Sequence, residues 1–251
     1  MKKIILLLWL IVPQLYAQTV RVAVAANAQF VMEELEAVFE KETGVELETI
    51  INSSGKITTQ IQQGAPFDVF LSADMHYPDV LFKEGLTTAA PKIYAYGALV
   101  VWGIGATKPT KDLSFLTQPS IKKIAIANPK LAPYGVAAQE ALRHYGLFEK
   151  TQSKWVMGES ISQVNQYILS QAVEVGFTAK SVVLDPSLKG QGTWIEIDPR
   201  TYSPIAQGVV LLKKKNAEPS LAARRFYDFL FSKRAQAIFR KFGYRIVTQQ
   251  K

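Results

Sequence analysis

The stretch TVRVAVAANAQFVMEELEAVFEKETGVELETIINSSGKITTQIQQGAPFDVFLSA, residues 19–73, decides the fold, because three strand patterns alternate in it with two helical patterns. The strand patterns are residues 19–26, 45–51 and 67–73. The first of them is apolar and β-branched, as buried parallel strands are. Short strands that alternate with helices are typical of a doubly wound α/β sheet, and this is the fold class that the stretch predicts.

The two helical patterns have recognisable faces and ends. In the first, Leu35 and Phe39 lie on an apolar face opposite a run of glutamates, and Gly44 is placed to end the helix as a left-handed cap. In the second, Ile57 and Ile61 mark a short helix that begins directly after the second strand. Each helix therefore has a side that a sheet can cover.

The rest of the chain repeats this alternation. Strands are expected near 94–103, 123–127, 154–157, 173–177, 193–197 and 204–215, and helices near 134–145, 160–170, 217–231 and 233–242. The two long strand patterns bracket the middle series, which suits a chain that crosses into a second lobe and returns. We expect lobe I at 18–97 and 207–251, lobe II at 98–206, and a ligand cleft between them.

The N-terminus has the layout of a secretory signal peptide. Lys2 and Lys3 form a basic segment, residues 4–12 an apolar core, and Ala17 ends a plausible cleavage site. The apolar run is shorter than the roughly 20 residues that span a membrane. We therefore expect residues 1–17 to be removed and the mature protein to be exported to the periplasm.

Composition excludes several classes of site. The chain of 251 residues has no cysteine, which rules out disulfides, thiolate metal sites and a cysteine nucleophile. Its formal charge is +8, or 8 − 2 = +6 without Lys2 and Lys3. The basic residues are scattered, and the densest run, 213–215, is not interleaved with aromatic residues. A nucleic-acid surface is therefore not expected.

The segment NSSGKITT, residues 52–59, raises the question of a phosphate loop. That motif requires a glycine five positions before the Gly-Lys pair and a Ser or Thr after it, but Ile50 and Ile57 stand there. The nucleotide interpretation fails. Two remain: Ser53 and Ser54 cap the helix, or the helix start binds another anion through its free N–H groups. In either case we expect Lys56 to point to solvent.

Three other turns have the same character. Asn27 follows the first strand, Pro133 opens a helix after ANPKLA, and Ser160 with Gln163 forms a capping-box pattern. If these helix starts converge, they form a cage of neutral donors for an anion. Sequence spacing does not show whether they converge.

Enzymatic interpretations have little support. His76 and His144 are far apart in helix-like segments, and no metalloprotease, serine-hydrolase or dinucleotide motif is present. Asp68 and Asp74 flank a strand, where local capping explains them. We expect no catalytic site, no cofactor and no directly bound metal.

The chain resembles the periplasmic molybdate-binding proteins of ABC transporters. The resemblance rests on AAN, SSG…QIQQGAPFDVFLSAD, IANPKLAPYGVAA, GESISQ, VGF and FYDFLFS…FRKFGY, which follow in order along the whole mature chain. It implies a type II periplasmic binding protein fold, in which each lobe is a doubly wound mixed sheet flanked by helices. It also implies a monomer that captures molybdate or tungstate between its lobes and delivers it to a membrane permease and its ATPase.

The resemblance also implies which residues bind the anion. Asn27 and Ser54 would offer side-chain and backbone donors from lobe I, and Tyr134 and Ile161 backbone N–H groups from lobe II. Ala26 and Ser53 adjoin these positions and are counted with them.

This chain departs from part of the family, because Ala179 stands where some members have a tyrosine donor. Tyr96–Ala98 and Gln207–Gly208 are the expected hinge strands. Two alternatives stay open: a receptor for sulfate, phosphate or another oxyanion, and an exported enzyme or sensor built on the same fold.

Overall fold

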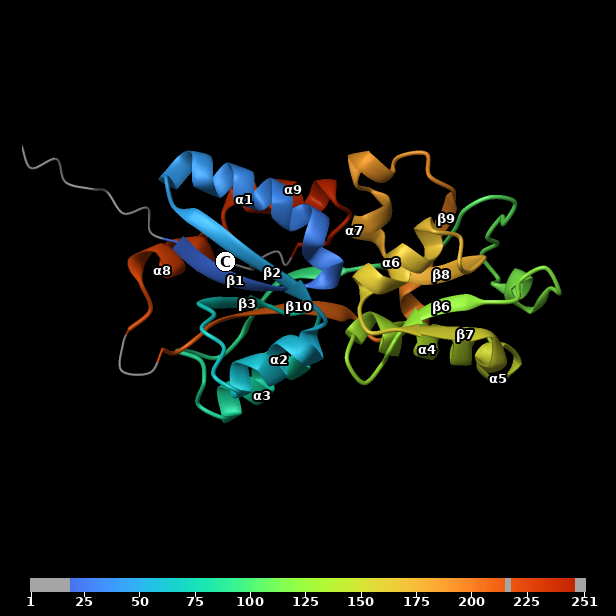
Figure 1. Ribbon diagram of the computed structural model, residues 1–251, viewed down its shortest axis with the longest axis horizontal. Coiled ribbons are helices and arrows are strands. Elements are labelled where there is room, and N and C mark those ends of the chain that lie inside the picture. The colour runs from blue at the N-terminus through green and yellow to red at the C-terminus, as the bar shows by residue number, and fades with distance from the viewer. Residues whose placement is uncertain (1–18, 215–217, 247–251) are drawn as a thin grey trace, which may run out of the picture.

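The computed structural model describes residues 19–214 and 218–246, which form two lobes, each built around one five-stranded sheet (Figure 1). The predicted signal peptide, residues 1–17, lies outside the described residues, as does Lys215 of the lysine run. Within 19–214 and 218–246, no helix is both long and apolar enough to cross a bilayer.

Lobe I is the part of the chain built on the first sheet. In spatial order its strands are β2 (Glu46–Asn52), β1 (Thr19–Ala25), β3 (Val69–Leu71), β10 (Ile205–Leu211) and β4 (Lys92–Gly97). Strand β1 runs parallel to β2 and β3, and β10 runs antiparallel to β3 and β4. The flanking helices are α1 (Gln29–Thr43), α2 (Ser54–Gln62), α3 (His76–Lys83), α8 (Leu221–Phe229) and α9 (Lys233–Lys241). Helices α1 and α9 cover one side of the sheet, and α2 and α3 cover the other (Figure 1).

Lobe II has the same plan. Its strands in spatial order are β7 (Trp155–Gly158), β6 (Ile124–Ala127), β8 (Val175–Ala179), β5 (Leu99–Gly103) and β9 (Thr193–Glu196). Strand β6 is parallel to β7 and β8, whereas β5 is antiparallel to β8 and β9. Its helices are α4 (Pro133–His144), α5 (Phe148–Thr151), α6 (Ile161–Leu169) and α7 (Lys180–Val183). The two-lobed α/β fold with mixed sheets is therefore confirmed.

The strand expected at 94–103 is divided in the structure. Its first half, β4, pairs with β10 in lobe I, and its second half, β5, pairs with β8 in lobe II, with Ala98 alone between them. The return crossing precedes Ile205, because β10 already belongs to the lobe I sheet. Gln207 and Gly208 are therefore not a crossing point, contrary to the expectation, and β10 begins two residues before the expected boundary at 207.

Periodicity and capping residues in the sequence predicted most of the helices and strands. The elements that were not predicted are short. Helix α1 ends at Gly44, which has φ 68°, as predicted. Helices α5 and α7 have four residues each, too few to produce a detectable period. The short 3-10 helices were also not predicted: η1 (Ala26–Ala28), η2 (Ser114–Thr117), η3 (Gln152–Lys154), η4 (Pro186–Leu188) and η5 (Pro199–Thr201).

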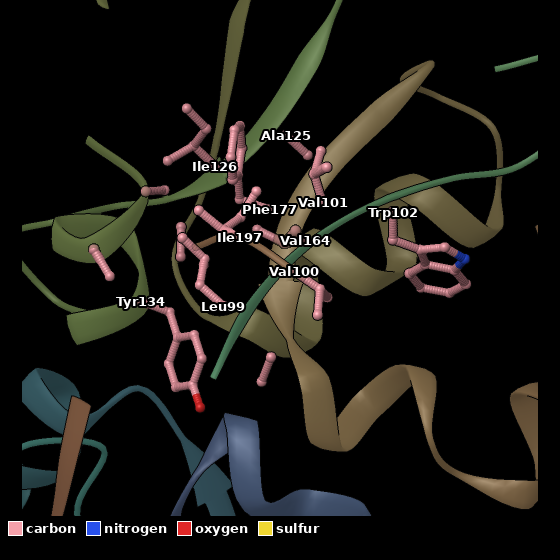
Figure 2. Close-up of a cluster of buried hydrophobic side chains, with 14 of the residues drawn as sticks. Leu99, Val100, Val101, Trp102, Ala125, Ile126, Tyr134, Val164, Phe177 and Ile197 are labelled. Atoms are coloured by element: carbon pink, nitrogen blue, oxygen red, sulfur yellow. The ribbon is translucent and has the colours of Figure 1, made fainter. Parts of the chain in front are cut away.

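The core of lobe II lies between its sheet and helices and includes Val101, Trp102 and Phe177, all almost fully buried. Tyr134 lies at the edge of this cluster. In Figure 2 its ring leaves the cluster and its hydroxyl points toward the segments of lobe I. The start of α4 is thus anchored in one lobe while its tyrosine reaches the other.

Gly135 permits the start of α4 to lie close against the preceding loop. A Cβ at this position would be 2.0 Å from the carbonyl oxygen of Ala127 and 3.0 Å from the backbone nitrogen of Pro129. Both are backbone atoms that cannot rotate away.

We expect Gly135→Ala to destabilise the protein by about 1–3 kcal/mol through overpacking. Helix propensity alone predicts the opposite sign, a gain of up to about 1 kcal/mol. Urea unfolding followed by circular dichroism measures the difference. The control is Val136→Ala at the next, exposed position, which we expect to change stability by less than about 0.5 kcal/mol. A gain in stability for Gly135→Ala would contradict the steric argument.

Candidate functional site

The carboxyl ends of the parallel strands of both sheets face one small void between the lobes, with a volume of about 10 Å³. Its lining contains all six residues that the sequence singled out: Ala26, Asn27, Ser53, Ser54, Tyr134 and Ile161. Ala25, Ala73 and Ala132 also line it and were not predicted. The position of Ala73 just after β3 was the available signal, since parallel strands end at one edge of a sheet.

The lobe I wall presents two serines that do not cap their helix. Ser53 is the N-cap residue of α2 and has extended backbone angles, but its side chain makes no capping hydrogen bond. Its Oγ is buried and has no partner among the described residues. Ser54 Oγ accepts a hydrogen bond from the backbone N–H of Ala73 at 3.0 Å, which leaves its own proton free to donate. The capping interpretation of these serines is therefore wrong.

The lobe II wall consists of two helix starts. Tyr134 is the second residue of α4, after Pro133, and Ile161 is the first residue of α6. Backbone N–H groups in a first helical turn have no acceptor within the helix, and the helix dipole makes this end positive. Both residues are almost completely buried and line the void.

The capping box predicted before α6 is present in part: Ser160 caps the helix, but Gln163 reaches the N–H of Glu159 instead of that of the N-cap residue. Ser160 Oγ accepts from the N–H of Gln163 at 3.3 Å, and Gln163 Oε1 accepts from the N–H of Glu159 at 2.6 Å. Two N–H groups near the helix start are thus satisfied locally, whereas the N–H of Ile161, in the first turn, has no acceptor within the helix.

No residue that lines the void carries a charge. Lys56 is the cationic residue nearest in sequence to Ser53 and Ser54. It forms an ion pair with Glu159 of lobe II, with 2.5 Å between Nζ and Oε2. Lys56 was expected to point to solvent; its side chain is partly exposed, and the ion pair with Glu159 was not predicted. The pair is partly exposed and connects the two lobes.

Further hydrogen bonds join the lobes around the void. The N–H of Gly55 donates to the carbonyl of Leu131 at 3.0 Å, and the Tyr77 hydroxyl donates to the carbonyl of Lys130 at 3.1 Å. Ser162 Oγ and Gln29 Oε1 are 2.9 Å apart. These contacts describe a closed arrangement of the two lobes.

Asn27 is tied into the interior beside the void. Its Nδ2 donates to Gln207 Oε1 at 2.8 Å and to the Tyr244 hydroxyl at 3.1 Å, which uses both amide hydrogens. Its backbone carbonyl oxygen accepts from Ser181 Oγ of lobe II at 2.6 Å. The side-chain donor expected from Asn27 is thus engaged by protein groups, and its backbone remains as the part that can face an anion.

Ala179, where a tyrosine donor was considered, does not line the void. It is fully buried at the end of β8 and pairs with Leu99 of β5. Its methyl group is part of the lobe II core.

The residues considered for catalysis stay apart from the void. His76 begins α3 in lobe I and His144 ends α4 in lobe II. Asp68 accepts from the N–H of Arg21 and pairs with Lys214, and Asp74 accepts from the N–H of Tyr77. Across 19–214 and 218–246, no three His, Asp or Glu side chains are grouped so that they could hold a metal ion.

A two-lobed α/β chain with a small uncharged void between its lobes has the architecture of a solute-binding protein. The chain belongs to the bacterial extracellular solute-binding protein family, whose model matches residues 20–245. This is a family of binding proteins rather than enzymes.

Among its relatives is the molybdate-binding protein ModA of Azotobacter vinelandii, which is 40% identical over 91% of this chain and 90% of its own length. The solved structure of an A. vinelandii periplasmic molybdate-binding protein superposes with a TM-score of 0.85 and 31% identity, covering 91% of this chain and all of that one. The sulfate-binding protein SubI of Mycobacterium tuberculosis has a TM-score of 0.75 and 14% identity over 92% of this chain and 88% of that one, a likeness in fold alone.

We expect Ser54→Ala to weaken anion binding by about 1–3 kcal/mol, because a buried acceptor on the anion loses its donor. Isothermal titration calorimetry with molybdate measures the loss, and circular dichroism checks the fold. Ser170→Ala, at an exposed position on lobe II, is the matched control and should bind as the parent does. Unchanged affinity in Ser54→Ala would remove Ser54 from the site.

The ion pair between Lys56 and Glu159 should add little affinity, since exposed pairs contribute about 0–1 kcal/mol. We expect Lys56→Ala to weaken binding by no more than about fivefold, and less at high salt. Lys241→Ala breaks an exposed pair with Glu34 inside lobe I and should leave binding unchanged. Calorimetry at two salt concentrations tests this; a loss in Lys56→Ala that salt does not reduce would contradict an electrostatic role.

Proposed function

We propose that this protein is a periplasmic receptor that captures molybdate or tungstate between its lobes and delivers it to an ABC permease. The observation that carries the proposal is the void itself, which lies between the lobes, is lined by no charged residue and is bordered by hydroxyl groups and helix starts from both lobes. The 40% identity to a molybdate-binding protein supports the choice of anion.

A cage of neutral donors suits an anion that has only acceptors. Molybdate and tungstate are dianions without a proton at neutral pH, so every oxygen can accept from Ser53, Ser54 or a backbone N–H. Hydrogen phosphate carries a proton that would face donors instead of an acceptor. An unmet buried group of this kind costs about 1–3 kcal/mol, which is enough for discrimination.

Size must separate molybdate from sulfate, which has the same charge and also lacks a proton. The void in this closed arrangement measures about 10 Å³, far below the roughly 300–1,000 Å³ of pockets for drug-sized ligands, so the site is one for a small ion. A receptor for sulfate or another tetrahedral oxyanion is the alternative, because the fold it shares with SubI is compatible with either ligand.

Capture follows from a hinge motion of the lobes. The chain crosses between the sheets at Ala98 and again before Ile205, and we propose that the lobes rotate about these two segments. Closing would bring Tyr134 and Ile161 of lobe II over Ser53 and Ser54 of lobe I. The mature monomer, residues 18–251 after removal of the signal peptide, would present the closed lobes to the permease and its ATPase.

Titration of residues 18–251 with molybdate, tungstate, sulfate and phosphate in a calorimeter tests the proposal. We expect tight binding of molybdate and tungstate, and binding of sulfate and phosphate weaker by at least about tenfold. Tight sulfate binding would favour the alternative receptor, and the absence of any response to molybdate would overturn the proposal.

A further inference from the structure

We propose that Gln207 is a positioning residue of the anion site: its buried amide holds the lining loops of lobe I in place and lies where Tyr134 of lobe II arrives on closure. The inference rests on the proposed function and adds a residue that does not itself line the void. Gln207 is fully buried on β10, so its amide has to find partners within the protein.

An irregularity in the sheet lets Gln207 meet its partners. Between Gln207 and Gly208 the pairing of β10 with β4 shifts by one residue: Gln207 lies opposite Ala95, whereas Gly208 lies opposite Ile93. Tyr94 is thus the extra residue in β4. Bulges of this kind re-aim side chains beside functional sites, and here the Tyr94 hydroxyl donates to Gln207 Oε1 at 3.3 Å.

The amide of Gln207 contacts two loops that line the void. Its Oε1 accepts from Asn27 Nδ2 at 2.8 Å, and its Nε2 approaches the carbonyl of Ala73 at 3.5 Å. Ala73 in turn donates its N–H to Ser54 Oγ at 3.0 Å. A displaced Gln207 side chain would therefore move the loop after β1 and, through Ala73, the hydroxyl of Ser54.

The same amide lies next to Gly97, the last residue of β4, directly before the crossing at Ala98. A Cβ on Gly97 would be 2.1 Å from the Tyr134 hydroxyl oxygen and 2.7 Å from Gln207 Nε2, so both groups approach the same Cα. The Tyr134 hydroxyl is buried without a hydrogen-bond partner among the described residues. Figure 2 shows the Tyr134 ring extending from the lobe II cluster. The backbone N–H of Tyr134 is a proposed donor to the anion, so the position of the ring influences the position of that donor.

The surroundings require an uncharged side chain that both donates and accepts. The titratable groups packed around Gln207 are Tyr94, Tyr134 and Tyr244, with Asp74 and its neighbour His76 in the loop whose carbonyl accepts from Gly208. Burial raises the pKa of Tyr94 and Tyr134 well above the ordinary value and that of Tyr244 to about 12, so all three stay neutral. Burial also raises the pKa of Asp74, and every variant below retains this group.

The test compares Gln207→Glu and Gln207→Met with the parent protein in molybdate calorimetry from pH 5.5 to 8.5. Burial raises the pKa of a glutamic acid into this range. At pH 5.5 the protonated carboxyl group of Gln207→Glu can still donate and accept, whereas at pH 8.5 the carboxylate only accepts and repels a dianion. Affinities are expressed relative to the parent at each pH, which removes any change in the anion or in Asp74.

We expect Gln207→Glu to bind at least about tenfold more weakly at pH 8.5 than at pH 5.5 relative to the parent. Gln207→Met should be weaker by a constant factor at every pH. Gln118→Glu adds the same charge at an exposed position of lobe II and should follow the parent. If Gln207→Met does not fold, Tyr94→Phe replaces it, with an expected loss of about two- to fivefold at every pH.

Equal and pH-independent losses in the two Gln207 variants would show a merely structural role and overturn the inference, as would unchanged affinity in both. With Tyr94→Phe as the substitute, unchanged affinity in Tyr94→Phe or a pH-independent loss in Gln207→Glu would also overturn it. If the parent itself does not bind molybdate, the proposed function fails, and the inference that rests on it fails with it.

Discussion

The first turn of an α-helix contains N–H groups that have no acceptor inside the helix, and this chain gathers such turns from both lobes around one void. The arrangement depends on parallel strands. In each lobe the strands that precede the helix starts run in the same direction, so α2 begins beside η1 in lobe I, and α4 begins beside α6 in lobe II. Donors that come from backbone are held by the sheets themselves, so they are in place before any ligand arrives.

A dianion buried in this void has to be compensated by hydrogen-bond donors, because burying a charge is costly unless the charge is paired or hydrogen-bonded. The structure keeps its charges at the rim, where Lys56 and Glu159 pair across the lobes in partial contact with solvent. Inside, hydroxyl groups and N–H groups do the binding that we propose. Neutral groups can donate hydrogen bonds to a dianion without the very high affinity that a buried cation would produce. This suits a receptor that must release its ligand.

A buried polar network lies beside the void. Asn27, Gln207 and Tyr244 form a buried polar network behind the lining, and Tyr134 enters it from the other lobe. Such networks are costly when a partner is missing, so they favour one arrangement over nearby alternatives. The network lies where β4, β5 and β10 meet. Its preference for one arrangement therefore links the relative position of the lobes to the geometry of the site.

The sequence by itself determined the features that arise within a few residues: the α/β alternation, the helix end at Gly44, the helix cap at Ser160 and the four helix starts. Only the tertiary structure decided that these starts meet, that Ser54 is held by Ala73, and that the strand at 94–103 is divided at Ala98. The partner of Lys56 lies 103 residues away and that of Asn27 180 residues away. The physical reason is that periodicity and capping act through neighbouring residues, whereas pairings at such distances depend on how two complete sheets pack.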